Sequence, residues 1–208
     1  MQFNFIAKYY TFVSRLAFGN VLEVAKTSLY HKVPLNGKVL LIGGGTGVSL
    51  AYLLKLDSGL KIDYVDASSE MIKLAKLRVP KTHVNFICTP FEAHTSKGYD
   101  VIITEFFLDL FTVAQIEEHI GSIKNKLNKE GIWIDTDFRH SNHLSRKILI
   151  KGMYLFFRVV SGVKISSLAD YLSILKGNGF MLKEEKIFKS GLITSRLFVQ
   201  TQSHLPSE

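Results

Sequence analysis

A buried strand that runs directly into a glycine loop is the feature that most constrains how this chain folds. Val39-Leu40-Leu41-Ile42 is followed at once by Gly43-Gly44-Gly45-Thr46-Gly47, and a helical pattern begins at the next residue. Glycines allow a ligand to lie against the backbone, because a side chain at Gly43 or Gly45 would take the ligand's place. Asp66 follows Gly47 by 19 residues, at the end of the next predicted strand, where its carboxylate can accept hydrogen bonds from both hydroxyls of a ribose. The pattern predicts a nucleoside site at the end of a parallel strand.

Apolar runs alternate with amphipathic stretches of helical length along most of the chain. This alternation predicts βαβ units and a sheet covered on both faces. The predicted strands are 38–42, 61–65, 84–88, 99–104 and 132–137, the clearest helices are 114–127 and 166–177, and a hairpin joins 180–188 to 192–200. We therefore expect one α/β domain over residues 1–200. It has a seven-stranded, mostly parallel sheet with an antiparallel hairpin at its C-terminal end, and residues 201–208 form a disordered tail.

The spacing of the glycines separates two classes of nucleotide site. Dinucleotide sites use G-x-G-x-x-G, but Val48 stands at the third place of that pattern, so the match is G-x-G-x-G. This form resembles the first motif of the class I methyltransferases that depend on S-adenosylmethionine (SAM), and residues 64–71 resemble their second motif. The resemblance implies a Rossmann-like fold and SAM as the cofactor. It also implies contacts to SAM from Gly43, Gly44, Gly45, Gly47, Asp66, Ala67, Ser68 and Met71.

Residues 84–92 lie where members of this family flank the adenine ring after the third strand. The resemblance implies that Thr89, Pro90 and Phe91 line the adenine part of the site. Pro90 stands where an acidic residue is common, so we expect the adenine contacts to come from the backbone and from Phe91.

Residues 99–107 resemble the fourth motif of the family, which ends beside the methionine part of SAM. Glu105 is the residue that the resemblance would place against the ammonium group of SAM. An alternative interpretation is that this carboxylate simply ends the strand. Leu41 stands where many members place an acidic residue that holds the methionine end.

Residues 1–36 are predicted to form an N-terminal helical cover. Within it, Lys8–Gly19 is similar in spacing to the segment before the first motif in quinone-biosynthesis methyltransferases. By that resemblance, Tyr9 closes over SAM, where the face of its ring attracts the sulfonium. Tyr10 stands in place of the aspartate of that pattern. The alternative is that the aromatic residues of this segment only pack a helix on the core.

The excess positive charge lies in the last third of the chain. Residues 1–138 carry 15 Lys or Arg against 14 Asp or Glu, whereas residues 139–200 carry 11 against 3. Residues 139–165 are predicted to form a basic helical insertion at the acceptor site, with a basic stripe opposite a wide apolar face in 145–160. Such a helix suits an anionic membrane surface or an acidic carrier protein as a partner, or it covers an apolar pocket.

His140 and His143 lie three residues apart after the fifth predicted strand. A neutral imidazole is available at physiological pH, so either residue is a candidate for the base that takes a proton from the acceptor. With Tyr9, they complete the catalytic candidates. No carboxylate or cysteine accompanies them at metal-ligand spacing, so we predict no metal site.

These observations predict an enzyme that transfers the methyl group of SAM to an oxygen or carbon atom of a small, largely apolar acceptor. We expect a quinone precursor, a lipid-like molecule or a carrier-bound aromatic or polyene acid. The sequence has no long apolar run and no signal-peptide pattern, and its single cysteine, Cys88, lies in an apolar run that predicts a buried thiol. We therefore expect a cytoplasmic protein that can rest on a membrane surface.

Two other functions remain as alternatives. The glycine string also resembles polyamine synthases, which transfer an aminopropyl group from decarboxylated SAM, but the basic last third lacks the acidic residues that grip a polyamine. A non-catalytic module that binds SAM or nucleic acid is the other alternative. The sequence argues against nucleic acid as a partner, because it lacks an Arg-rich groove motif and a base-methylation signature.

Overall fold

The computed structural model describes residues 18–79, 84–139 and 171–201. The elements, in chain order, are α2 (Val21–Thr27), η2 (Tyr30–Lys32), β1 (Lys38–Ile42), α3 (Val48–Leu56), β2 (Lys61–Asp66), α4 (Ser69–Arg78), β3 (Val84–Cys88), η3 (Phe91–Ala93), β4 (Tyr99–Glu105), η4 (Leu108–Leu110), α5 (Val113–Lys126), β5 (Leu127–Phe138), α7 (Leu172–Gly177), β6 (Phe180–Phe188), η5 (Lys189–Gly191) and β7 (Ile193–Gln200). Here η denotes a short 3-10 helix.

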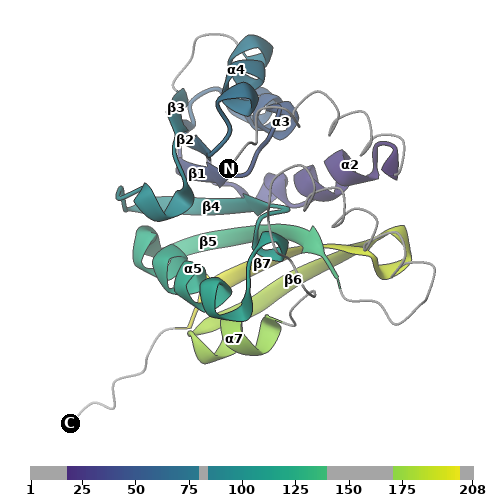
Figure 1. The fold of residues 1–208 in the computed structure, drawn as a ribbon, viewed down its shortest axis with the longest axis vertical. Helices are drawn as coiled ribbons and strands as arrows, with labels where there is room; N and C mark the ends of the chain where they lie inside the picture. Colours follow the sequence, from purple (N-terminus) through teal and green to yellow (C-terminus); the bar gives the residue numbers. More distant parts are fainter. Residues whose placement is uncertain (1–17, 80–83, 140–170, 202–208) are drawn as a thin grey trace.

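The described strands form one seven-stranded sheet in the order β3-β2-β1-β4-β5-β7-β6 (Figure 1). The first five are parallel, whereas β7 runs antiparallel between β5 and β6. The order changes direction at β1, which lies between β2 and β4. In sheets of this kind, ligands bind beyond the carboxyl ends of the strands at such a switch point. The fold therefore puts the glycine loop after β1 and the carboxylate after β2 at the expected place.

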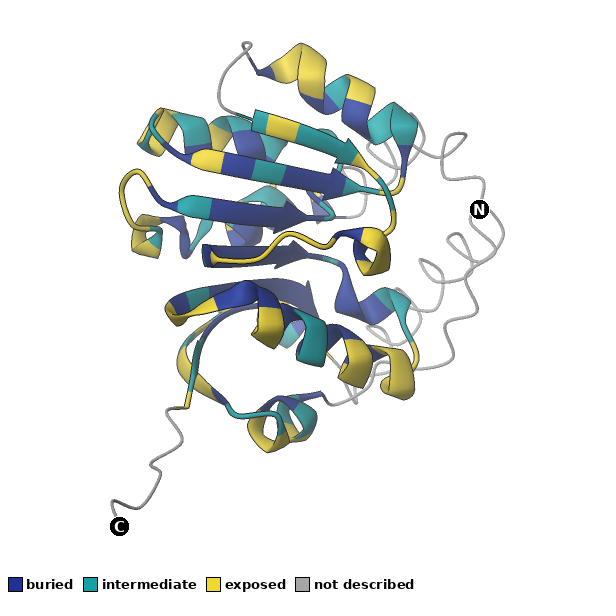
Figure 2. Cartoon of the chain, turned by 90° about the vertical axis from the view of Figure 1, so that its left-hand side faces the viewer, coloured by how far each residue is buried: buried dark blue, intermediate teal, exposed yellow. Residues whose placement is uncertain are grey.

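Helices cover both faces of the sheet. Alternate residues of each strand point to opposite faces, and apolar residues on both faces pack against helices. On one face, Leu40 and Ile102 pack with the apolar stripe of α5 and with Leu175 of α7. On the other face, Leu41 and Ile103 pack with apolar residues of α3 and α4. The central strands are dark along most of their length in Figure 2, which shows that they are buried from both sides. This burial explains why β1 reads as a continuous apolar run rather than an alternating one.

The strands predicted from the sequence are confirmed, apart from some of their ends. The largest difference is at β5, which begins at Leu127 rather than at Ile132. Residues 128–131 were predicted to form a turn, but they continue the strand across an irregularity in its pairing with β4, between Tyr99 and Val101. The expectation of a buried Cys88 was wrong, because β3 is an edge strand and this thiol is exposed at its end.

Several predictions fall on residues outside the described part of the chain. They concern the first part of the N-terminal cover, most of the basic insertion, the start of the helix predicted over 166–177 and the tail after Thr201. The described end of that helix, α7, stops at Gly177 as predicted.

Candidate functional site at the carboxyl edge of the sheet

The loop between β1 and α3 turns on three glycines with positive φ angles. These angles are +72° at Gly43, +61° at Gly45 and +77° at Gly47, in the left-handed region that side chains disfavour. A Cβ atom at Gly43 would lie 2.9 Å from the carbonyl oxygen of Glu105, and one at Gly47 would lie 2.8 Å from the Cα of Ala75. Backbone atoms of neighbouring segments therefore leave no room for a side chain at either position. At Gly43, the atom that excludes a side chain is one of the protein itself, whereas the sequence predicted that a bound ligand would exclude it.

Gly44 and Gly45 show opposite surroundings. A Cβ atom at Gly44 would lie 2.3 Å from a methyl group of Leu41 and 2.6 Å from the ring of Tyr64, so this glycine lies against the core. At Gly45 the nearest atom would be a backbone oxygen 4.0 Å away. Gly45 is thus the point where the loop presents bare backbone to open space, as a site for a closely bound ligand requires.

Asp66 lies beside this open backbone. One carboxylate oxygen accepts a hydrogen bond from the Ser68 amide at 2.8 Å, and the carboxylate also accepts one from the Gly45 amide. Burial raises the pKa of Asp66 to about 6, although these two amides act in the opposite direction. The carboxylate therefore points to the glycine loop, as the sequence predicted, and keeps capacity to accept further hydrogen bonds from a ligand.

Tyr64 holds the loop in place, although it is not among the site residues predicted from the sequence. Its hydroxyl donates to the carbonyl oxygen of Gly45 at 2.7 Å and accepts from the amide of Gly47. Its ring is fully buried and packs on Phe86, with 5.4 Å between the ring centroids. The signal was available in the sequence, because residues two apart in a strand share a face and Tyr64 precedes Asp66 by two.

Glu105, at the end of β4, is the centre of a buried polar network on the same face. Tyr30 donates a hydrogen bond to one carboxylate oxygen, and Ser49 donates to the other at 2.8 Å. Lys26 of α2 lies 3.6 Å from that second oxygen. Burial raises the pKa of Glu105, and the charge of Lys26 opposes this effect. The network connects α2 to the first turn of α3, and the contact of Glu105 with a ligand ammonium stays a prediction.

The adenine side of the predicted site is formed by the residues that follow β2 and β3. The Thr89 amide donates to the carbonyl of Asp66 at 3.1 Å, and Pro90 is exposed next to it. Phe91 points away from this edge into the core, where its ring packs on Phe107. Of the predicted adenine residues, Thr89 and Pro90 therefore lie at the edge, whereas Phe91 is buried in the core.

The start of α4 carries the remaining residues predicted from the second motif. Ser68 caps the helix, and its hydroxyl accepts a hydrogen bond from the Met71 amide at 3.3 Å. Ala67 is exposed and Met71 is partly exposed. These residues follow Asp66 directly, so the turn that carries them also fixes the aspartate.

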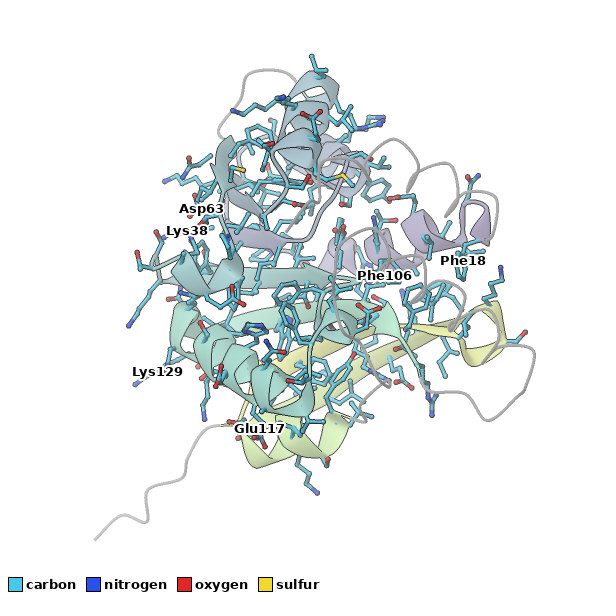
Figure 3. The ribbon with its side chains drawn as sticks, in the orientation of Figure 1. Phe18, Lys38, Asp63, Phe106, Glu117 and Lys129 are labelled. Carbon is cyan, nitrogen blue, oxygen red and sulfur yellow. The ribbon has the colours of Figure 1, made fainter. Side chains whose placement is uncertain are left out.

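Aromatic side chains gather where β4 and β5 end. Phe106 directly follows Glu105 with a φ angle of +49°, a strained value for a residue with a side chain. Its ring lies 4.8 Å from that of Phe138, which in turn lies 5.5 Å from that of Phe18. Figure 3 shows Phe106 and Phe18 toward one end of the sheet and Lys38 and Asp63 toward the other. These rings belong to an apolar cluster at the carboxyl edge, in which Phe18 and Phe138 are buried and Phe106 is partly exposed.

The three predicted catalytic residues, Tyr9, His140 and His143, lie outside the described residues. Their roles stay predictions, and the described geometry assigns them no contact.

Comparisons with known proteins agree with this site. Residues 40–133, which run from β1 into β5, match the family model described as a methyltransferase domain. A curated relative from Campylobacter fetus, carboxy-S-adenosyl-L-methionine synthase, is 31% identical over 101 residues. That match covers 48% of this chain and 43% of the relative, so less than half of the relative's length is compared.

Solved structures share the fold across nearly the whole chain at low identity. A TehB-like SAM-dependent methyltransferase from Corynebacterium glutamicum is 14% identical with a TM-score of 0.66, over 94% of this chain and 98% of that one. The 1,6-didemethyltoxoflavin-N1-methyltransferase of Burkholderia thailandensis, solved with S-adenosylhomocysteine (SAH), is 16% identical with a TM-score of 0.69, over 95% and 85%. Magnesium protoporphyrin IX methyltransferase of Synechocystis, also with SAH, is 16% identical with a TM-score of 0.67, over 90% and 85%. Residues 40–133 thus match a methyltransferase domain, and the strand order of the sheet is that of the SAM-dependent methyltransferase fold.

Proposed function

We propose that this protein is a SAM-dependent methyltransferase that acts on an oxygen or carbon atom of a small, largely apolar acceptor. The observation that carries the proposal is the aromatic cluster at the carboxyl edge, in which the partly exposed ring of Phe106 packs on the buried Phe138, and Phe138 on the buried Phe18. Flat apolar molecules pack well on such rings. The names of two solved relatives, which methylate a didemethyltoxoflavin and a magnesium protoporphyrin, also describe small ring-containing acceptors.

The described residues fit SAM and suggest how they hold it. Open backbone at Gly45 leaves room for the nucleoside, and the Asp66 carboxylate accepts from the ribose hydroxyls. Bound SAM supplies an activated methyl group on a sulfonium. The contribution of the protein is then largely to align the acceptor atom with the methyl carbon and the sulfur, and to exclude water.

Two measurements test this proposal. Isothermal titration should show binding of SAM and SAH, and no binding of NADH at the same concentrations. Incubation with methyl-labelled SAM and a panel of phenols, hydroquinones, apolar acids and amines should then transfer label to an apolar ring compound. Transfer only to amines of polyamine type would contradict the proposal.

The affinity for SAH is expected to depend on pH through Asp66. Ribose hydroxyls are donors, so they bind the ionised carboxylate, and the pKa of this group is about 6 in the free protein. Affinity should be constant above pH 7 and fall by up to tenfold per pH unit below about 6. Titration calorimetry between pH 5 and pH 8 measures this. The Asp66→Asn variant is the control, and its affinity should not change over this range.

Removing the hydroxyl of Tyr64 is expected to weaken SAH binding while the protein stays folded. Tyr64→Phe deletes two hydrogen bonds to the loop, worth roughly 1 kcal/mol each, so the dissociation constant should rise by up to about thirtyfold. Tyr99→Phe is the matched control, because it also deletes a buried hydroxyl, which bonds to Asp63 and His94 far from the loop. An equal effect of the two substitutions on affinity would show that Tyr64 acts only through general stability.

One relative supports a second candidate function. The Campylobacter fetus protein is named for the synthesis of a carboxylated SAM, so chemistry on SAM itself is an alternative to methyl transfer. Mass spectrometry separates the two, because methyl transfer converts SAM to SAH, whereas this alternative, supplied with a carboxylic acid that donates its carboxyl group, yields a heavier sulfonium and no SAH.

The proposed partners of the basic insertion are an anionic membrane surface and an acidic carrier protein. No helix of the described ranges is long and apolar enough to cross a bilayer. Sedimentation with anionic vesicles at low salt tests the membrane surface. We also propose that Tyr9 contacts SAM and that His140 or His143 contacts the acceptor, and alanine variants of each would test this in the labelled assay.

A further inference from the structure

A second group of polar side chains is buried at the same edge, on the face that α5 and α7 cover. Asp135 and Asp137 lie near the end of β5, and Asp109 lies in η4, which follows β4. The exposed fraction is 0% for both residues of β5 and 6% for Asp109. Burying charge is costly, so three carboxyl groups in this place require a reason. Within the described ranges, no three His, Cys, Asp or Glu side chains are arranged to hold a metal ion.

Asp135 has a structural role. It accepts hydrogen bonds from the hydroxyls of Thr104 and Tyr171, both at 2.8 Å. Arg196 lies opposite it in the pairing of β5 with β7, and its guanidinium favours the charged carboxylate. Both oxygens of Asp135 are therefore satisfied by side chains that join β4, β5, β7 and α7.

Asp109 and Asp137 are arranged differently. The two oxygens of Asp137 accept from the amides of Asp109, at 3.0 Å, and Phe138, at 2.8 Å. The Asp109 carboxyl is hydrogen-bonded to that of Asp137, but its Oδ1 has no hydrogen-bond partner among the described residues. Two carboxyl groups this close share one proton rather than ionise together. Burial raises the pKa of Asp109 to about 7 and that of Asp137 well above its usual value. The pair therefore carries one proton near neutral pH.

Thr194 provides a second, independent observation at this place. It lies directly opposite Asp137 in the antiparallel pairing of β5 and β7, so both side chains point to the same face. Thr194 is fully buried, and its hydroxyl also lacks a hydrogen-bond partner among the described residues. Buried polar atoms are normally paired. Two unpaired atoms, each on a residue next to Asp137, indicate that a ligand group completes this place.

Resting on the proposed function, we infer that Asp109 and Asp137 accept the proton of the acceptor, that Thr194 contacts it, and that the acceptor is a phenol, hydroquinone or enol rather than a carboxylic acid. The acceptor oxygen forms its bond to the methyl carbon as the bond from that carbon to sulfur breaks, and sulfur keeps the electron pair. The hydroxyl proton passes to Oδ1 of Asp109. A carboxylate acceptor has no such proton to give, and its charge would be repelled by the pair.

The position of the pair in the sheet fits this role. Neighbouring strands are about 4.8 Å apart, so β5 lies about 10 Å from β1 across β4. Asp109 belongs to η4, which follows β4, the strand between these two. Asp137 and Phe138 are adjacent in β5, so the carboxyl pair and the aromatic cluster lie at the same end of the strand, on opposite faces of the sheet.

The stability of Asp109→Asn tests this assignment without any acceptor. The pKa of Asp109 is raised in the folded protein, so the folded state binds more protons than the unfolded state between pH 3.8 and about 7. The free energy of unfolding therefore falls as pH rises through this range. The neighbouring groups that titrate or carry charge, Asp137, Asp135, Tyr171 and Arg196, are the same in both proteins.

Asp109→Asn should raise the Tm by about 5 °C at pH 8 and by much less at pH 5. Asp135→Asn, the matched control, should lower the Tm. A lower Tm for Asp109→Asn at pH 8 would show a structural carboxylate and overturn the inference.

The second arm compares two matched probes, an alkyl hydroquinone and the benzoic acid with the same alkyl chain. The wild type should methylate the hydroquinone at least tenfold faster, with a rate that rises with pH through about 7. Asp109→Asn should lower this rate about a hundredfold and leave the dissociation constant of SAH within twofold. Faster methylation of the benzoic acid, methylation of neither probe or an unchanged rate in the variant would overturn the inference. Failure of the wild type to bind SAH would instead overturn the proposed function.

Discussion

Replacing Asp66 with asparagine is expected to weaken the binding of SAM and SAH about a hundredfold or more. The carboxylate accepts from the Ser68 and Gly45 amides, which fix it beside the open backbone of the loop. Hydrogen bonds from ribose hydroxyls to a charged acceptor are each worth about 1.5–3 kcal/mol. An asparagine keeps one accepting oxygen but has an NH₂ group in place of the other. At least one hydrogen bond is therefore lost, because the NH₂ group and the group that donated to the carboxylate are both donors.

Titration calorimetry with SAH measures this loss, and the sequence offers a matched control. Asp63 lies in the same strand, three residues before Asp66, and bonds to Asn85 and Tyr99. Asp63→Asn should leave the affinity for SAH within twofold of the wild type. A dissociation constant for Asp66→Asn that stays within threefold of the wild type would place the nucleoside elsewhere, and the site built on this residue would be wrong.

The sequence predicted the sheet well, because its strands are short, apolar and separated by strong helix and turn signals. The strand from Val84 to Cys88 was predicted with both ends correct, as was that from Phe180 to Phe188. The start of β5 was missed for a physical reason. Residues 128–131 have the composition of a turn, but Tyr99 of the neighbouring strand pairs with Leu127 and extends the ladder across them. Local composition does not reveal a partner strand that lies almost 30 residues away.

The site residues that stand at a recognisable spacing in the sequence were predicted. Those that come from separate elements and contact one another only in the folded protein were missed. The glycine loop and Asp66 stand in a recognisable spacing, and the structure places them together. The partners of Glu105 come from α2, η2 and α3. The spacing of Lys26, Tyr30 and Ser49 in the sequence does not indicate that all three contact Glu105. The same is true of Asp109, Asp137 and Thr194, which come from three elements and are brought together by the order of the strands.

The glycines of the loop also looked alike in the sequence, although the structure gives them different tasks. Gly43, Gly44 and Gly47 are held by protein atoms that leave no room for a side chain, whereas Gly45 faces open space. Substitutions at these positions should therefore separate folding from ligand binding.

Gly47→Ala is expected to destabilise the protein strongly. The residue has a φ angle of +77°, and its Cβ atom would lie 2.8 Å from the Cα of Ala75 in α4. The left-handed conformation costs about 1–2 kcal/mol for a residue with a side chain, and overpacking against a fixed backbone costs about 1–3 kcal/mol more. The free energy of unfolding should fall by roughly 3 kcal/mol in total, which corresponds to a Tm lower by about 10 °C for a chain of this size.

Gly45→Ala shares the positive φ angle but not the contact, so the comparison isolates the role of the open space. It should cost only about 1–2 kcal/mol of stability, yet weaken SAH binding at least tenfold, because the new methyl group points to where the nucleoside lies. Gly121→Ala is the control for the substitution itself, since Gly121 lies in α5 with nothing near its Cβ position, and the helix should gain up to about 1 kcal/mol. Thermal unfolding measures the stability of the three variants, and titration measures their affinity for SAH. If Gly45→Ala bound SAH as tightly as the wild type, the space beside Gly45 would not hold the nucleoside, and the loop would be a turn shaped by packing alone.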